Sequence, residues 1–275
     1  MKKVISIVML ALFIVSCSTV PITGRKRVNF VSDAQILPAS FAQYESFLAE
    51  NKISADVGMT NEVQSVGMRI SKAVDQFMRA NGMEAEANSY RWEFNLIDDP
   101  TVNAWCMPGG KVVFYTGILP ICDNTNGVAA VMGHEVAHAF AKHGQERMST
   151  GTLLQLGGAG VALGTANKDP KTQQIWNTAF GLGAQFGIML PFSRNHETEA
   201  DKLGMVFMIM AGYQPEEAVN VWIRMSQRAS SDQAPPEFMS THPSNQTRIK
   251  NLKAFLPEAV KLAKKYSAQP VSSNQ

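Results

Sequence analysis

The pattern of apolar and polar positions predicts helices on both sides of a short sheet. Apolar residues recur at helical spacing between 60 and 78, from Val63 to Phe77, which indicates an amphipathic helix. RWEFNLID, residues 91–98, alternates apolar with polar side chains and predicts a half-buried strand. MPGG then predicts a turn, and KVVFYTG after it predicts a second strand.

Most of the remaining chain has the spacing of helices. One helix is predicted to begin near Asn126 and to stop at Gly144, and another to run from His196 to Ala211. Gly212 ends the second helix, and Pro215 opens the next one. We therefore expect an α+β fold that is mostly helical.

The stretch from Gly151 to Leu190 is apolar and rich in glycine, with NKDP in its middle. Each half falls short of the ~20 apolar residues that a membrane span requires. The glycines favour close helix packing or a mobile hairpin. We expect this stretch to belong to the core or to form a lid, and the alternative is a segment that contacts a membrane.

The first residues, MKKVISIVMLALFIVSC, have the charged start and apolar run of a secretion signal. The run is too short for the alternative, a membrane-spanning helix. IVSC resembles the cleavage box of bacterial lipoproteins, which implies a signal peptide over 1–16, a lipid on Cys17 and a polar tether over 17–32. Because Ser18 stands where inner-membrane lipoproteins carry Asp, we expect a periplasmic protein that lipidated Cys17 anchors to the outer membrane.

The charge balance excludes a nucleic-acid partner. The chain has 25 Lys+Arg and 23 Asp+Glu, and loss of the predicted signal removes two lysines, which leaves the mature chain neutral. Such a chain lacks the basic field that nucleic acids require. Its length allows one large domain or two small ones. We place a single domain over 33–266, followed by a disordered tail over 267–275.

Cys106 and Cys122 are the only other cysteines. In an oxidising compartment they can form a disulfide, and the alternative is a pair of buried thiols. The sequence leaves both open.

GHEVAHAFAKHG, residues 133–144, carries the strongest chemical signal. His134 and His138 are four residues apart, so on a helix both rings project from one face. Two imidazoles at this spacing can bind one zinc ion, while Glu135 reaches a water on the metal without becoming a ligand. The apolar residues between them predict that this helix is buried, where these polar groups need partners.

A catalytic zinc ion commonly takes a third protein ligand. His143 is about 140° round the helix from His138 and points elsewhere. The metzincin pattern is excluded because it requires Gly at 141 and His at 144, where this chain has Ala141 and Gly144.

Downstream, SRNHETEADKLG offers further candidates. Glu197 and Asp201 share one helix face, so one can bind zinc while the other accepts a hydrogen bond from a ligand imidazole. We expect Glu199 to be solvated and His196 to be a surface or supporting group.

HEVAHAFAKHG, SRNHETEAD and STHPSNQTRI together resemble the HtpX/Oma-type zinc metallopeptidases of peptidase family M48. NAWCMPGGKVVFYTGIL is similar to the strand and turn that precede the zinc helix in that family. The resemblance runs from about Val31 to Phe255. It implies a gluzincin-type domain in which the edge strand of a small sheet borders the active-site helix. The lipoprotein box points to the small periplasmic lipoprotein branch.

The resemblance also implies roles for single residues. One zinc ion per chain is held by His134, His138 and Glu197, with Glu135 as catalytic base and Asp201 supporting a ligand imidazole.

His242 matches a histidine that in relatives lies near the metal, where it stabilises the oxyanion or occupies the open zinc position. The alternative is a loop histidine before Pro243. Cys106 departs from the apolar residue that is usual at its position.

These features predict a zinc endopeptidase that cleaves unfolded or misassembled envelope proteins, with Glu135 as general base. We expect the KVVFYTG strand to be the edge on which an extended substrate pairs. One alternative is a non-catalytic lipoprotein that assists outer-membrane protein assembly, for which an intact Glu135 is unnecessary. Another is a zinc hydrolase of non-peptide amides.

Overall fold

The computed structural model describes residues 17–182, 184–185, 189–230, 237–242 and 246–268. The expected signal peptide and all but the first two residues of the expected tail lie outside them. Within these ranges, every helix is too short or too polar to span a bilayer. The chain divides into two compact units, one combining the N-terminal segment up to Ile36 with 142–197, the other 37–141 with 198–275. The expected domain boundaries, 33 and 266, stay a prediction.

The larger unit contains a three-stranded sheet in the order β3 (Glu93–Ile97), β5 (Lys111–Tyr115), β4 (Ala104–Met107). β5 runs parallel to β3 and antiparallel to β4. KVVFYTG is therefore the central strand, and the expectation that it forms the substrate edge was wrong. Strand order depends on long-range pairing, which the alternation within one strand does not report.

The predicted MPGG turn is confirmed between β4 and β5. Gly109 and Gly110 both have φ of 85°, a left-handed conformation that costs glycine little. A Cβ on Gly109 would overlap the ring of Phe41, and one on Gly110 would overlap that of Trp92.

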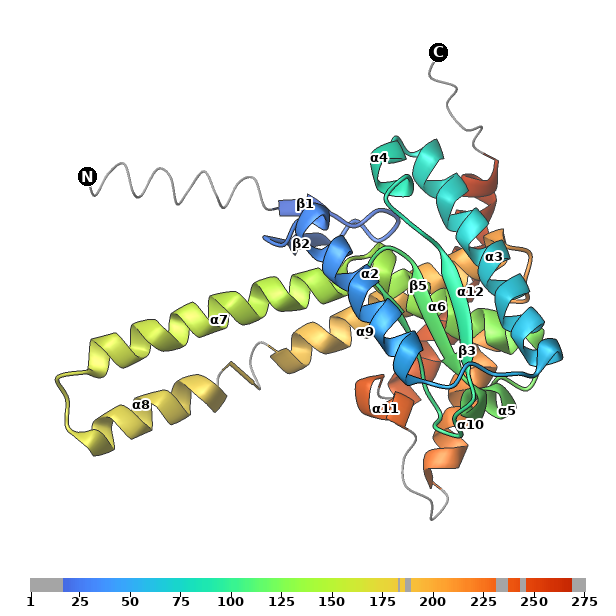
Figure 1. Ribbon diagram of the computed structural model, residues 1–275. Helices are drawn as coiled ribbons and strands as arrows, with labels where there is room; N and C mark the ends of the chain where they lie inside the picture. The colour runs from blue at the N-terminus through green and yellow to red at the C-terminus, as the bar shows by residue number, and fades with distance from the viewer. Residues whose placement is uncertain (1–16, 183, 186–188, 231–236, 243–245, 269–275) are drawn as a thin grey trace. The chain divides into compact units, whose positions relative to one another are not determined.

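Helix α2 (Asp33–Glu50) covers one face of the sheet (Figure 1). Its buried Tyr44 packs with Ile97 and Val113. The Tyr44 hydroxyl donates a hydrogen bond to the carbonyl of Val112 at 3.2 Å.

Helix α3 (Val57–Ala80) covers the opposite face, where Phe94 meets Gly67. This confirms the predicted amphipathic helix, which Asp56 caps by accepting a hydrogen bond from the amide of Met59 at 2.9 Å. Its apolar stripe is fully buried: Val63, Val66, Ile70, Val74 and Phe77. A short helix, α4 (Glu84–Ala87), follows α3.

Helix α6 (Thr125–Phe140) packs against α3 and β4. It begins where the sequence predicted, capped by the Asn124 side chain, which accepts a hydrogen bond from the amide of Gly127 at 3.0 Å. The predicted end at Gly144 was wrong. Lys142 takes a left-handed φ of 57° and ends α6, and Gly144 lies inside the next helix.

The 3₁₀ turn η1 (Thr116–Ile118) and α5 (Leu119–Cys122) join β5 to α6. Cys122 in α5 and Cys106 in β4 are both free thiols, so the disulfide alternative is not realised.

Helix α9 (Leu190–Met210) ends before Gly212, whose φ is 81°, as predicted. The backbone of its Gly204 contacts the backbone of Gly133 in α6. The contact is so close that a Cβ on Gly133 would lie 2.8 Å from the carbonyl oxygen of Gly204. The remaining helices are α10 (Glu217–Ser230), α11 (Glu237–Thr241) and α12 (Gln246–Ser267).

The smaller unit contains a hairpin of β1 (Cys17–Thr19) and β2 (Lys26–Val28) and the helices α7 (His143–Thr165) and α8 (Pro170–Leu182). The two helices lie side by side as a hairpin, in which Phe180 packs on Gly157. No residue of α8 is buried, so a core position was wrong for this part of the 151–190 stretch, and the other expectation, a lid, stays a prediction. Lipidation of Cys17, the first residue of β1, stays a prediction.

Candidate metal centre

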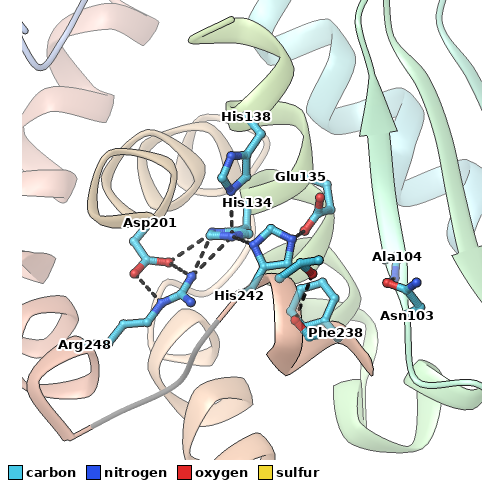
Figure 2. A network of polar contacts seen from close by, with 10 residues as sticks. Asn103, Ala104, His134, Glu135, His138, Asp201, Phe238, His242 and Arg248 are labelled. Atoms are coloured by element: carbon cyan, nitrogen blue, oxygen red, sulfur yellow. Dashed lines mark hydrogen bonds and ion pairs between the residues drawn. The ribbon is translucent and has the colours of Figure 1, made fainter. Parts of the chain in front are cut away.

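Three histidines and a glutamate come together around α6. One ligand atom from each of His134, His138, Glu197 and His242 lies within 4.8 Å of the others. His134 and His138 project from the same face of α6, with their Nε2 atoms 3.1 Å apart (Figure 2). Nδ1 of His242 lies 3.2 Å from Nε2 of His134. Glu197 lies on α9.

These atoms suit a zinc ion. Two imidazole nitrogens bound at ~2.0–2.1 Å to one tetrahedral zinc ion lie about 3.3 Å apart. The separations at His134, 3.1 and 3.2 Å, are close to this value. Imidazole nitrogen and carboxylate oxygen are also donors that zinc takes readily. The residues present therefore fit this metal.

Asp201 lies one turn after Glu197 on α9. Its Oδ1 is 3.0 Å from Nδ1 of His134. A hydrogen bond from Nδ1 to this carboxylate fixes the ring and leaves Nε2 to face the other ligands. The supporting role that the sequence analysis gave to Asp201 stays a prediction.

Arg248 of α12 completes the support. Its Nε donates to Oδ2 of Asp201 at 2.7 Å, and its Nη2 donates to Oδ1 at 2.6 Å. Burial alone would raise the pKa of Asp201. The charge of Arg248 and the hydrogen bond with His134 lower it by a larger amount, so the pKa lies below its ordinary value. Asp201 is therefore held ionised.

Sequence reasoning missed Arg248 and its neighbour Trp222. The guanidinium carbon of Arg248 lies 3.4 Å from the centre of the Trp222 ring, a cation–π contact. The ring of Trp222 in turn meets that of His134 at 5.5 Å. The signal for Arg248 was its place in STHPSNQTRI. Trp222 belongs to an ordinary amphipathic helix and gave no such signal.

Glu135 is buried beside the histidines, with 3% of its surface exposed. Nε2 of His242 lies 3.6 Å from its Oε1, so the His242 ring is between Glu135 and His134 (Figure 2). This position suits either role expected of His242, support of an oxyanion or occupation of a metal position.

The residues just before β4 hold the segment that carries His242. The amide of Phe238 donates a hydrogen bond to the carbonyl of Val102 at 3.0 Å. The amide of His242 donates one to the carbonyl of Phe238 at 2.9 Å. Asn103 adds a side-chain hydrogen bond to Glu237 at 3.2 Å. The segment of His242 is therefore linked to the residues that lead into the edge strand.

A second buried network lies next to Glu197 in sequence. The ring of His196 stacks on that of His143, with centroids 4.0 Å apart, and its Nε2 lies 3.0 Å from Oε2 of Glu146. Arg25 donates two hydrogen bonds to Glu146, at 2.7 and 2.9 Å. Burial alone would raise the pKa of Glu146. The hydrogen bonds with His196 and Arg25 lower it by a larger amount, so the pKa is about 2.

This network decides two expectations about the histidines. His143 is outside the ligand group, as predicted. His196 is fully buried, so a surface position was wrong. Glu199 was expected in solvent but is 3% exposed, because α9 also buries Ala200 and Leu203 around it.

The chain is similar to known metallopeptidases. The sequence model of Peptidase family M48 matches residues 65–256. Mitochondrial metalloendopeptidase OMA1 of Schizosaccharomyces pombe is 34% identical over 242 residues, which are 87% of this chain and 66% of that protein. OMA1 of Saccharomyces cerevisiae is 31% identical over 248 residues, 87% and 69% of the two chains. The Beta-barrel assembly-enhancing protease of Escherichia coli is 25% identical over 240 residues, 85% and 46%.

The chain thus spans about two thirds of the length of the two yeast relatives and under half of the Escherichia coli one. The comparison contradicts the expected location, a periplasm with a lipid anchor in the outer membrane. The yeast and Arabidopsis thaliana relatives are named as mitochondrial proteins. The expectation rested on the short IVSC pattern, and four residues are too few to fix a compartment.

Proposed function

This chain belongs to peptidase family M48, and from this premise we propose that it is a zinc-dependent endopeptidase that cleaves unfolded or misassembled proteins. The observation that carries the proposal is the cluster of His134, His138, Glu197 and His242, within 4.8 Å of one another and beside buried Glu135.

His134, His138 and Glu197 would hold one zinc ion per chain. When bound, zinc supplies a Lewis acid that lowers the pKa of water towards ~7 and polarises a peptide carbonyl. Asp201 and Arg248 contribute by holding His134 in the orientation and tautomer that a ligand needs.

Glu135 acts as general base. It accepts the proton of the attacking water and later donates it to the leaving amine. His242 lies 3.6 Å from Glu135, where its ring can stabilise the oxyanion or close the site at rest. The buried position of both groups strengthens their electrostatic interactions with a bound peptide.

An extended substrate would pair with β4. β4 is an edge of the sheet and packs against α6, so backbone hydrogen bonds along it would bring a peptide past Glu135. A folded protein has no free strand for such pairing, which favours unfolded or misassembled substrates. The name Beta-barrel assembly-enhancing protease, carried by two relatives, supports a role in the quality control of protein assembly.

Casein degradation with and without a chelator tests this function. We expect purified protein to degrade casein, to lose the activity on chelation and to regain it with zinc. A protein that binds zinc and unfolded casein but never cleaves it would instead be the non-catalytic assembly factor.

A further inference from the structure

We propose that a pocket beside β4 recognises a large apolar side chain of the extended substrate. This inference rests on the proposed function and names the substrate feature that the same site selects. The pocket is lined by α2 and β4, and its lining residues are Gln43, Phe47, Trp105, Cys106 and Met107.

The pocket has the size and chemistry for one or two large side chains. Its volume is about 360 Å³, within the usual range of ligand-binding pockets. None of the residues that line it is charged. Phe47, Trp105 and Met107 supply apolar walls, and methionine adapts its shape to irregular apolar groups. A charged side chain placed there would lose water without gaining a partner.

The aromatic wall is held rigidly. The ring of Trp105 meets that of Phe47 edge to face, with centroids 4.9 Å apart and planes at 81°. Tyr44 packs on Trp105 in the same way, with centroids 6.1 Å apart. Nε1 of Trp105 donates to the hydroxyl of Tyr115 at 3.4 Å. Phe47 and Trp105 remain only half-buried, so part of their apolar surface is open to a ligand.

The occupant follows from the geometry of the edge strand. Trp105 and Met107 are two residues apart on β4, so they share one face of the sheet. A peptide paired with β4 places every second side chain on that face, above these two residues. The pocket lies where such a side chain would fall.

The same strand connects the pocket with the candidate active site. β4 packs against α6, the helix that carries Glu135. Figure 2 draws Ala104, at the start of the strand, in the same close-up as Glu135 and His242. A peptide along β4 would therefore reach both places at once.

The substrate class is a segment with a large apolar residue, aromatic, leucine or methionine, at a fixed distance from the cleaved bond. Folded proteins bury most such residues. Unfolded and misassembled proteins expose them, so the pocket would direct cleavage to those chains.

Binding to the zinc-loaded full chain with Glu135→Gln tests the pocket without hydrolysis. The probes are fluorescein-labelled ten-residue peptides that are identical except for Phe, Ser or Lys at one position, which is moved along the peptide. Fluorescence anisotropy should show that Phe binds at least about tenfold more tightly than Lys at one position. Phe47→Ala and Trp105→Ala should reduce that ratio to near one.

Trp92→Ala is the matched control. Trp92 is also half-buried, but it precedes β3 at the other edge of the sheet, and its loss should leave the ratio unchanged. Gln43→Lys guards against unfolding, since residue 43 is exposed. This variant should weaken the binding of the Lys peptides further. It should also strengthen the binding of an additional peptide that carries Glu at the same position. A Phe preference that persists in Phe47→Ala and Trp105→Ala, or no Phe preference at any position, would overturn the pocket.

Casein degradation by the wild-type chain, measured in parallel, separates the two proposals. Selective binding of Phe peptides without any hydrolysis would contradict the proposed peptidase activity and would still support the pocket. Hydrolysis without a preference for Phe peptides would contradict only the proposal about the pocket.

Discussion

Arg248 donates two hydrogen bonds to Asp201, and the same carboxylate lies 3.0 Å from Nδ1 of His134. The three side chains are buried, so each charge depends on the others for stabilisation. The orientation of a candidate metal ligand is therefore set by a residue of α12, distant in sequence.

Arg248→Gln should weaken zinc binding while the ligands stay intact. Loss of a residue that supports a metal ligand typically costs about 10–100-fold in affinity. Competition with a chromophoric chelator would measure the zinc dissociation constant, and the visible spectrum of the cobalt form would report altered ligand geometry. Arg79→Gln, which breaks the Arg79–Asp75 ion pair, is the control and should change neither. Equal zinc affinity in both variants would show that Arg248 does not support the site.

Glu197→Ala and Glu199→Ala form a matched pair that tests the choice of carboxylate. Both residues are buried on α9, but only Glu197 belongs to the ligand group. Metal analysis should find near-unit zinc in Glu199→Ala and little in Glu197→Ala. The reverse pattern would mean that Glu199 is the ligand.

Glu135→Gln should keep zinc and lose hydrolysis. Glu135 transfers a proton and makes no bond to the metal, and general-base catalysis is typically worth about 10²–10⁴-fold. The readouts are zinc content, thermal unfolding and casein turnover. Turnover equal to that of the wild type would place the base elsewhere.

Glu146 should make stability fall in acid. Its pKa in the folded chain is about 2, against an ordinary value of 4.5. Its carboxylate therefore stabilises the fold fully above about pH 4.5, and this contribution is lost as the pH falls from there towards 2. Urea unfolding between pH 7 and 3 would measure this loss, which Glu146→Gln should lack. Parallel curves for the two chains would contradict it.

Local patterns predicted the fold better than long-range ones. The spacing of His134 and His138 gave the candidate site because both lie on one helix, and one helix fixes their geometry. The order of β3, β5 and β4 is a non-local property, so the central strand was mistaken for an edge. The burial of Glu199 was missed for a similar reason, since it depends on how many neighbours surround α9.

The α7–α8 hairpin shows the same limit from the other direction. Its apolar composition suggested burial, yet Leu156, Leu163, Ile175 and Trp176 are each more than half exposed. Composition measures the tendency of a segment to leave water, not whether a neighbour is present to cover it.

The contact between Gly133 and Gly204 has a consequence for protein engineering. Helices usually pack with their axes about 8–10 Å apart, at a distance that their side chains set. Here a Cβ on Gly204 would lie 2.8 Å from the backbone of Gly133, so the main chains themselves act as the spacer. A graft of His134, His138 and Glu197 onto another pair of helices would reproduce the donor atoms without this spacer. The glycine pair would have to be transplanted with the ligands for the grafted site to close around a metal.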